Sequence, residues 1–461
     1  MKIKVANLGA IGAGTIDLSK KINLLCGHNG TGKTYFSYLI YGLLRNHLHV
    51  KGDDEIADRL LNDRHVVVNI DFHTLNLYRA EMLKNTISEI GDLFGVGVDV
   101  CEKLFKNTDI SFGETEDEFN EQIINASMER SALIQGVKVM MSKQEGEQSI
   151  KLDILDDSIP NSAIQGFRMF LTSFVLYNLS IYPVSGVAVF PVERNSIYTF
   201  SKELSIRKQE AMDNLQLLVD KEKKISKFDI FFNSKRYPLP VKDGLMVAED
   251  LAEIKKEKSD FYIFAENLEN ELLHGKVKIS NDGDIQFSPE RSLRTVLPIQ
   301  MSASIVKTLS SLVVYLKHLA KRNDLIIIDE PEINLHPNNQ IIIARILARL
   351  ANQGFRLLIS THSDYIIREF NNMVMLSMNN NEKIESIRKE NGYSEDEYIK
   401  VNDIGVYSFT YKTKKSKNVT LVPLKVDQAG FAVDVIDNVI ESQNEIAESL
   451  YYAMKYGKDE E

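Results

Sequence analysis

The sequence contains very few cysteines. Cys26 and Cys101 are far apart and belong to no CxxC pair, so neither a disulfide framework nor a zinc site is indicated. The N-terminus also lacks the apolar stretch and cleavage site of a secretory signal peptide. We therefore expect a protein of the reducing cytoplasm.

An excess of positive charge is missing as well. The formal net charge is −10 at pH 7, which argues against a surface built for nonspecific nucleic-acid binding. One local basic stretch, YKTKKSKN at 411–418, is interpreted as a solvated hairpin turn, with a nucleic-acid contact as the alternative.

No apolar run is long enough to be a convincing membrane span. The nearest candidate is the uncharged stretch at 170–190, which Asn178, Pro183 and Gly186 divide into a helix end, a turn and a short strand, VAVF. The composition, 44% hydrophobic and 26% charged residues, is that of a globular protein with a sizeable core.

The sequence does contain a phosphate-binding pattern. GHNGTGKT at 27–34 matches GxxxxGK[ST], between a buried strand, KINLLC, and an amphipathic helix. Glycines let backbone N–H groups point at phosphate oxygens, and the helix N-terminus adds its dipole. We expect Lys33 to reach the β- and γ-phosphates and Thr34 to bind Mg²⁺. The nucleotide-binding residues are predicted to be Gly27, His28, Asn29, Gly30, Thr31, Gly32, Lys33 and Thr34.

The second half of this site lies far downstream. DLIIIDEPEINLHP at 324–337 is an apolar strand that ends in two carboxylates. Asp329 is expected to hold Mg²⁺, and Glu330 to orient and deprotonate the attacking water. A further strand in FRLLISTHSDYI, at 355–366, places His362 where it would sense the γ-phosphate. The alternatives are that the two carboxylates form an acidic turn and that His362 is structural. The presence of a phosphate loop in the same chain favours the catalytic roles.

Together these segments resemble a known family. An N-terminal hairpin, GHNGTGKT, a long insertion, DEPEINLHP and THS occur in the order seen in ABC-type ATPases of the RecF, SMC and OLD (overcoming lysogenization defect) group. More narrowly, the chain is similar to the stand-alone ATPase subunits of anti-phage defence systems of the PARIS or Septu type. The likeness is specific over about residues 1–45 and 290–376, and only architectural between them.

The resemblance implies further site residues. It assigns the signature motif to Met301, Ser302, Ala303 and Ser304, the D-loop to Asn334, Leu335 and His336, and the switch histidine to His362. In this group the signature of one subunit closes over the nucleotide of the other, so a head-to-tail homodimer with two composite sites is implied. The chain has SAS where LSGGQ or LSSG is usual. The two serines still begin a helix whose N–H groups and hydroxyls suit a γ-phosphate, and they also fit ordinary helix capping.

The expected fold class is α/β: an ABC-type P-loop NTPase head with a large, mainly helical insertion and a small α+β C-terminal element. The head is divided between residues 1–75 and 291–400, the insertion covers 76–290, and 401–461 hold a hairpin at about 404–426 and a closing helix at about 431–456. Since this last part offers no room for the TOPRIM nuclease domain of OLD proteins, we expect any nuclease to be a separate polypeptide.

Several predictions concern the insertion and its borders. HVVVNIDF at 65–72 is predicted as a strand of the first lobe, and 196–274 as a helical hairpin with arms at 196–228 and 246–274. This hairpin is far too short for the long arm of an SMC protein. VAVFPVERNSI resembles a strand-then-PAER element of these ATPases, in which Glu193 and Arg194 are expected to form a structural ion pair, with a place near nucleotide or a subunit interface as the alternative.

Two acidic stretches have simpler interpretations. SFGETEDEFNEQ at 111–122 is predicted as a loop entering a helix. KVKISNDGDIQF at 276–287 is predicted as a hairpin, whose Asn-Asp-Gly turn explains Asp282 and Asp284 better than a metal site does.

The leading functional hypothesis is a cytoplasmic ATPase, using ATP and Mg²⁺, that acts as sensor or regulator of a separate effector. The effector is expected to be a TOPRIM or HNH nuclease in anti-phage defence. The alternative is a RecF-like DNA-binding repair ATPase, which predicts salt-sensitive duplex binding. A transporter motor is disfavoured by the SAS signature and the long insertion.

Overall fold

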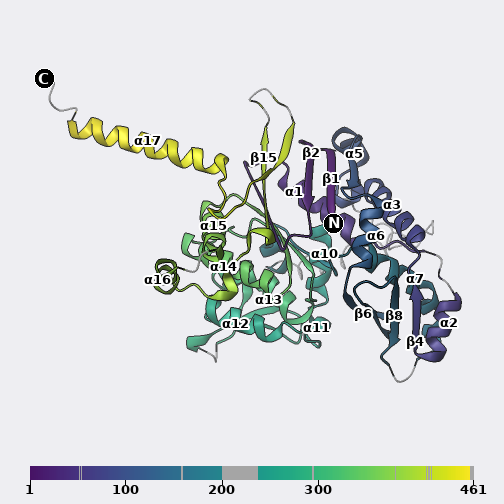
Figure 1. Ribbon diagram of the computed structural model, residues 1–461. Helices are drawn as coiled ribbons and strands as arrows, with labels where there is room; N and C mark the ends of the chain where they lie inside the picture. The colour runs from purple at the N-terminus through teal and green to yellow at the C-terminus, as the bar shows by residue number, and fades with distance from the viewer. Residues whose placement is uncertain are drawn as a thin grey trace, which may run out of the picture.

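The chain folds around one large mixed sheet covered by helices on both faces (Figure 1). The computed structural model describes residues 1–50, 52, 54–156, 159–199, 237–292, 295–378, 381–411, 413, 416 and 418–456. The α/β fold class and the P-loop NTPase head are confirmed.

Within the described residues the main sheet has the strand order β5-β1-β2-β16-β15-β3-β14-β13-β9. Strands β15, β3, β14, β13 and β9 run parallel, whereas β1 pairs antiparallel with both β2 and β5. The bounds are β1 (Lys2–Leu8), β2 (Ile11–Asp17), β3 (Ile22–Gly27), β5 (Asp109–Phe112), β9 (Val187–Phe190), β13 (Leu325–Asp329), β14 (Arg356–Thr361), β15 (Ile404–Tyr411) and β16 (Val419–Leu424).

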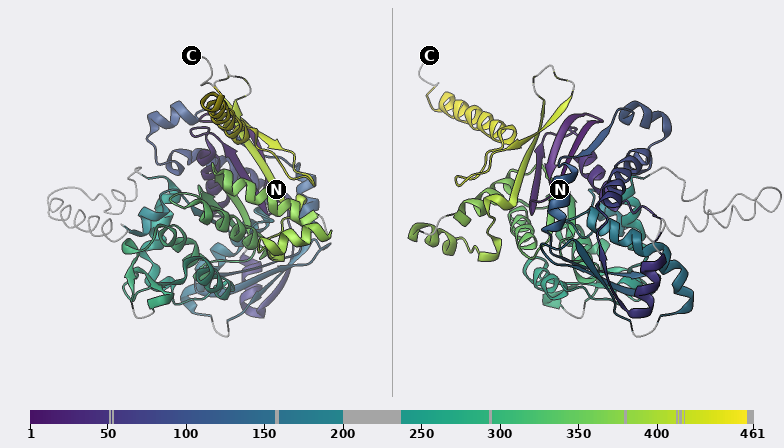
Figure 2. Two further views of the ribbon diagram at one scale, coloured as in Figure 1. Left: turned by 90° about the vertical axis from the view of Figure 1, so that its left-hand side faces the viewer. Right: turned by 45° about the vertical axis from the view of Figure 1, so that its right-hand side comes forward.

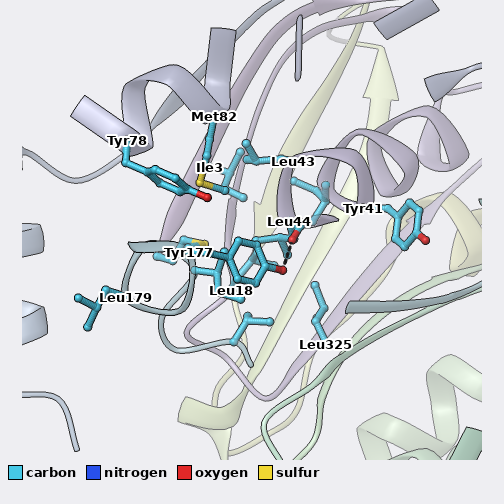
Figure 3. Packing of buried hydrophobic residues seen from close by; sticks show 14 of the residues in the cluster. Ile3, Leu18, Tyr41, Leu43, Leu44, Tyr78, Met82, Tyr177, Leu179 and Leu325 are labelled. Carbon is cyan, nitrogen blue, oxygen red and sulfur yellow. Dashed lines mark hydrogen bonds between the residues drawn. The ribbon is translucent and has the colours of Figure 1, made fainter. Parts of the chain in front are cut away.

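The central strands are apolar because both of their faces are covered. Every residue of β3 and β13 is buried, as expected for parallel strands between two layers of helix. Successive side chains of β3 point to opposite faces, so Leu25 belongs to one hydrophobic cluster while Leu24 and Cys26 belong to another. Figure 3 shows part of the first cluster, where the Tyr177 hydroxyl donates to the Leu44 carbonyl at 2.6 Å.

The helices that cover the sheet and extend from it have the following bounds: α1 (Lys33–Arg45), α2 (Asp54–Asp63), α3 (Phe72–Ser88), α4 (Ile90–Leu93), α5 (Val98–Phe105), α6 (Glu116–Ile124), α7 (Ile164–Ser180), α10 (Leu239–Glu249), α11 (Leu251–Ile254), α12 (Tyr262–Leu273), α13 (Ser304–His318), α14 (Pro337–Asn352), α15 (Asp364–Met378), α16 (Glu382–Glu390) and α17 (Asp434–Tyr456). The predicted entry into α6 is confirmed: Thr115 and Glu118 form a capping box.

The insertion contains a second sheet that the sequence analysis did not foresee. It has the order β4-β8-β7-β6, all antiparallel, with β4 (His65–Asn69), β6 (Met128–Ile134), β7 (Val137–Lys143) and β8 (Ser149–Ile154). The strand predicted at 65–72 therefore exists as β4, but it pairs with β8 and does not join the main sheet. A separate three-stranded sheet holds β10 (Gly275–Ile279), β11 (Ile285–Pro289) and β12 (Leu297–Pro298), which confirms the hairpin predicted at 276–287.

The remaining predictions have mixed outcomes. The run at 170–190 is the end of α7, a turn and β9, as predicted, and none of the described helices has the length and apolar character that a bilayer span requires. The C-terminal hairpin and closing helix are confirmed as β15, β16 and α17. The helical hairpin predicted at 196–274 is only partly described, and its described arm is not one helix. Its first arm falls mostly on residues 200–236, outside the described part, and its second arm is broken into α10, α11 and α12.

Candidate functional site

The predicted phosphate loop connects β3 to α1. Gly30 and Gly32 have φ values of 74° and 94°, a conformation that glycine adopts at low cost. The Lys33 ammonium donates to the carbonyls of Gly27 and His28, each at 3.0 Å, and the Thr31 hydroxyl donates to the same His28 carbonyl at 2.8 Å. The loop therefore curls around the ammonium, whose burial lowers the pKa of Lys33.

Asp329 lies beside this loop, at the end of β13. The Thr34 hydroxyl donates to Asp329 Oδ2 at 2.8 Å, and the Ser360 hydroxyl donates to Asp329 Oδ1. Burial raises the pKa of the Asp329 carboxyl, while these two hydrogen bonds lower it. Residues some 300 positions apart thus meet at the same edge of the sheet, because β3, β14 and β13 are parallel neighbours.

Glu330 and His362 form the next layer of the site. Glu330 has a φ of 47°, and its N–H donates to the Ser360 carbonyl at 3.0 Å. Its carboxylate Oε1 lies 3.4 Å from His362 Nε2, with both side chains about one-third exposed at 33% and 28%. The hydrogen bond from His362 lowers the pKa of Glu330, against the opposing effect of burial. The sequence-predicted base and sensor are therefore neighbours.

The chemistry of these groups fits a magnesium nucleotide. A hydroxyl and a carboxylate next to a curled loop of N–H groups offer the hard oxygen ligands that Mg²⁺ takes alongside phosphate oxygens. No group of three or more histidine, cysteine, aspartate or glutamate side chains suited to a metal is present in the described part of the chain. The residues that could hold the ion are Thr34 and Asp329, whose side-chain oxygens lie 2.8 Å apart.

Arg194 lies at the site, whereas the sequence analysis gave a place near the nucleotide only as the alternative to a structural ion pair. Its guanidinium donates to the backbone carbonyls of Pro191, Asp329 and Glu330 at 3.0, 2.7 and 2.8 Å, and its side chain is buried. None of the ion pairs among the described residues joins Arg194 to Glu193; Arg194 instead supports the backbone that carries the two carboxylates. The only signal was the position of PVER directly after a predicted strand.

Glu332 was missed by the sequence analysis. Its Oε1 accepts hydrogen bonds from the Thr361 hydroxyl at 2.8 Å and from the His362 N–H at 2.6 Å. Burial raises the pKa of this carboxyl, and Oε2 has no partner in the described part. Gln340 makes a parallel bridge, donating to the Leu335 carbonyl at 2.9 Å and accepting from the Ser363 hydroxyl at 2.5 Å. Two side chains therefore tie the segment after β13 to the loop after β14.

The residues assigned to the D-loop lie on this segment. Asn334 is exposed with a φ of 60°, Leu335 is buried, and His336 is the N-cap of α14, accepting from the Asn338 N–H through Nδ1 at 3.3 Å.

The assigned signature lies at the start of α13. The N-cap of this helix is Ala303, and no side chain caps it, so helix capping by the serines is wrong. Ser302 is buried and its hydroxyl donates to the Pro298 carbonyl at 3.4 Å, whereas Met301 and Ser304 are exposed. Among the described residues no hydrogen bond joins this segment to the phosphate loop of the same chain.

A cavity in the described part of the molecule is a different feature. Its volume is about 1570 Å³, and it lies between the exposed edge of β6 and the segment after α13, away from every predicted site residue. Asp282 and Asp284 belong to the turn between β10 and β11, as expected. The nucleotide site is therefore identified by its hydrogen-bond network and not by cavity size.

Comparison with known proteins agrees with this geometry. Residues 1–367 match the family described as AAA ATPase domain. No curated protein matches the chain.

The fold is similar to solved SMC heads. An Smc head bound to the C-winged helix domain of ScpA is 10% identical, with a TM-score of 0.36 over 93% of this chain and 98% of that one. An Smc head with an extended coiled coil, bound to the C-terminal domain of ScpA derived from Pyrococcus furiosus, is 13% identical, with a TM-score of 0.34 and coverage of 97% and 98%. The SMC head domain from Thermotoga maritima is 11% identical, with a TM-score of 0.32 and coverage of 92% and 98%.

Proposed function

Since this chain belongs to the AAA ATPase domain family, we propose that it binds ATP with Mg²⁺ at GHNGTGKT and hydrolyses it to ADP and phosphate. The observation that carries this proposal is one continuous network. Thr34 and Ser360 both donate to Asp329, and Glu330 next to it lies 3.4 Å from His362.

Each group has a role that follows from its chemistry. Lys33 and the loop N–H groups would neutralise the phosphates, and Thr34 and Asp329 would hold Mg²⁺, which would supply positive charge to the phosphate oxygens. Glu330 accepts a proton from the attacking water. His362 donates a hydrogen bond to the γ-phosphate and orients Glu330. Arg194 fixes the backbone of Asp329 and Glu330 and thereby holds both carboxylates in position.

We further propose that the complete site needs a second copy of the chain. The N–H groups in the first turn of α13 have no side-chain cap, so they suit the γ-phosphate bound by another subunit. Ser302, Ala303 and Ser304 of one copy would then close over the GHNGTGKT loop of the other, in a head-to-tail dimer. The bridges made by Glu332 and Gln340 would carry this closure from the D-loop to His362.

The biological role that we propose is regulation of a separate effector. ATP binding closes the dimer, hydrolysis or a phage trigger reshapes it, and this change holds or releases a TOPRIM or HNH nuclease in the cytoplasm. The support is the resemblance of GHNGTGKT, DEPEINLHP and THS to stand-alone ATPase subunits of PARIS and Septu systems.

The first test uses a variant that binds ATP without hydrolysing it. Tagged Glu330→Gln is expressed in its native host, captured with ATP and Mg²⁺, and analysed by mass spectrometry and nuclease digestion, with Lys33→Ala as the variant that cannot bind ATP. We expect a stoichiometric second protein on Glu330→Gln and not on Lys33→Ala. Duplex DNA without a protein partner would instead favour the RecF-like repair ATPase.

A second test addresses the separation of ATPase and effector. The purified chain should hydrolyse ATP but leave nucleic acid intact. If it cuts nucleic acid alone, and Glu330→Gln abolishes the cut, a separate effector is no longer required.

A further inference from the structure

The C-terminal helix α17 projects from the body of the molecule (Figures 1 and 2). It runs over 23 residues, and every side chain described between Glu441 and Lys455 is exposed. Large apolar groups are among them: Ile446 is 51% exposed, Leu450 60% and Met454 78%. Most helices in proteins gain their stability by packing an amphipathic face, and within this chain the described face of α17 packs against nothing.

The base of α17 is firmly attached. Phe431 and Val433, just before the helix, are buried in the second hydrophobic cluster. The Phe431 N–H donates to Asn371 Oδ1 on α15 at 2.9 Å. The Asp437 carboxylate of α17 lies 3.7 Å from the guanidinium of Arg368, which is also on α15. The helix is therefore an anchored arm, and its exposed face has a defined direction.

The arm has one apolar face and one acidic face. Ile440, Ala447, Leu450 and Met454 share one face of the helix at seven-, three- and four-residue spacing, with the polar Gln443 on the same face and Ile446 and Tyr451 on the flanks. At 100° per residue, Glu441, Glu445 and Glu448 fall on the opposite side. A partner that covers the apolar face would therefore meet none of these three carboxylates.

The pattern is self-complementary when two copies lie antiparallel. With residue 445 at the centre, Ile440 of one helix lies opposite Leu450 of the other. The same register places Asp437 of one copy opposite Ala453 of the other, two residues, or about 3 Å along the helix axis, from the level of Lys455, at both ends of the pair. A parallel pair would bring no opposite charges together, because the flank facing Asp437 and Lys455 would then hold Ile446 and Ala453.

We propose that α17 pairs antiparallel with α17 of a second copy and makes the chain a dimer without nucleotide. This contact is distinct from the proposed ATP-dependent closure and does not rest on it. Each copy then has two self-complementary contacts. When they join different copies, ATP should convert the dimer into larger assemblies with an even number of chains.

The test is the mass of the full-length chain in solution without nucleotide, measured by light scattering after size-exclusion chromatography. Wild type should show about twice the 52.4 kDa of one chain. Leu450→Glu/Met454→Glu, which charges the apolar face, should run as a monomer. Ser442→Glu/Ser449→Glu adds the same two charges to the opposite face and should stay dimeric.

Orientation is tested by cysteine cross-linking in a Cys101→Ser background. In the antiparallel pair Ile446 approaches itself across the two-fold axis, so Ile446→Cys should cross-link under mild oxidation, whereas Leu450→Cys should not. Cross-linking at Leu450 alone would overturn the antiparallel arrangement. A monomeric wild type, or a dimer insensitive to Leu450→Glu/Met454→Glu, would overturn the proposal. Because no nucleotide is added, neither result depends on the ATPase proposal, which Lys33→Ala tests separately.

Discussion

Glu332 shows how a residue without direct contact to substrate can control the site. Its Oε1 accepts from both Thr361 and His362, so it fixes the position from which His362 reaches Glu330. It is a positioning residue, and its effect should be on the rate of the chemical step more than on ATP binding.

We expect Glu332→Ala to lower kcat about 10- to 100-fold with little change in the KM for ATP, because the switch loop loses two hydrogen bonds of about 1.5 kcal/mol each. Glu332→Gln keeps an acceptor oxygen at the same position and should restore most of the rate. Steady-state ATPase assays measure both parameters. Equal losses in the two variants would mean that charge, and not the hydrogen bonds, is what matters.

The pair formed by Glu330 and His362 predicts a pH effect. The hydrogen bond from His362 lowers the pKa of Glu330 from its usual value of 4.5, so the carboxylate remains a base at lower pH. Replacing His362 by alanine removes this cause, and the acid limb of kcat against pH should move to higher pH. His65→Ala, in the insertion, is the control and should leave the limb in place. If the acid limb does not move in His362→Ala, a group other than His362 determines its position.

The sequence was informative about residues whose function depends on a local pattern. GHNGTGKT and DEPE follow strands that are recognisable from their apolar runs, and parallel neighbours bring Thr34 and Asp329 within 2.8 Å. The contacts of Arg194 and Glu332 could not be found this way, because their partners lie on other segments: the Asp329 and Glu330 carbonyls for Arg194, and the Thr361 hydroxyl and His362 N–H for Glu332. Such contacts depend on how strands are placed side by side, which periodicity does not encode.

At the scale of secondary structure, the close contact between β3 and β15 sets a strict limit on side-chain size. Gly27 pairs with Phe409 across these strands. A Cβ on Gly27 would lie 2.7 Å from the Phe409 carbonyl oxygen, and its φ is 150°. The end of the phosphate-binding strand therefore has no room for a side chain.

We expect Gly27→Ala to destabilise the protein by about 2 to 4 kcal/mol through overpacking and backbone strain. Gly136→Ala is the matched control: its φ of 87° also disfavours a side chain, but nothing lies within 4 Å. Its cost should be about 1 to 2 kcal/mol. Urea unfolding gives both free energies. Equal losses would mean that the steric contact with β15 is relieved by movement of the strand.

The elements themselves were easier to predict than their pairing. IGVYSFTY at 404–411 was recognised as part of a hairpin, yet nothing in it indicated that β15 would lie beside β3. The alternating segments MERSALI and VKVMMSK carried a strand pattern that was overlooked within a region expected to be mainly helical. The segment between α15 and β15 likewise contains a helix that was overlooked, α16, which Asn381 caps through its side chain.

At the scale of the whole molecule, nucleotide binding should stabilise the entire sheet, because β3 occupies an interior position in it. Mg²⁺ and ATP at about 100 times Kd should add about 2.7 kcal/mol, raising the Tm of wild type and of Glu330→Gln. Lys33→Ala should not respond. Thermal unfolding with and without Mg²⁺ and ATP measures the shift, and an equal rise in Lys33→Ala would place the nucleotide elsewhere.

The position of β3 has a consequence for how the protein is made. The ribosome releases β3 early, but its two neighbours, β14 and β15, emerge only after about 330 and 380 further residues. At typical elongation rates of about 5 to 20 residues per second, the strand waits roughly 20 to 80 seconds for its second neighbour. A nascent chain therefore cannot assemble its phosphate-binding centre until β15 has been synthesised, and premature termination before Tyr411 removes an interior strand of the sheet and not a dispensable edge.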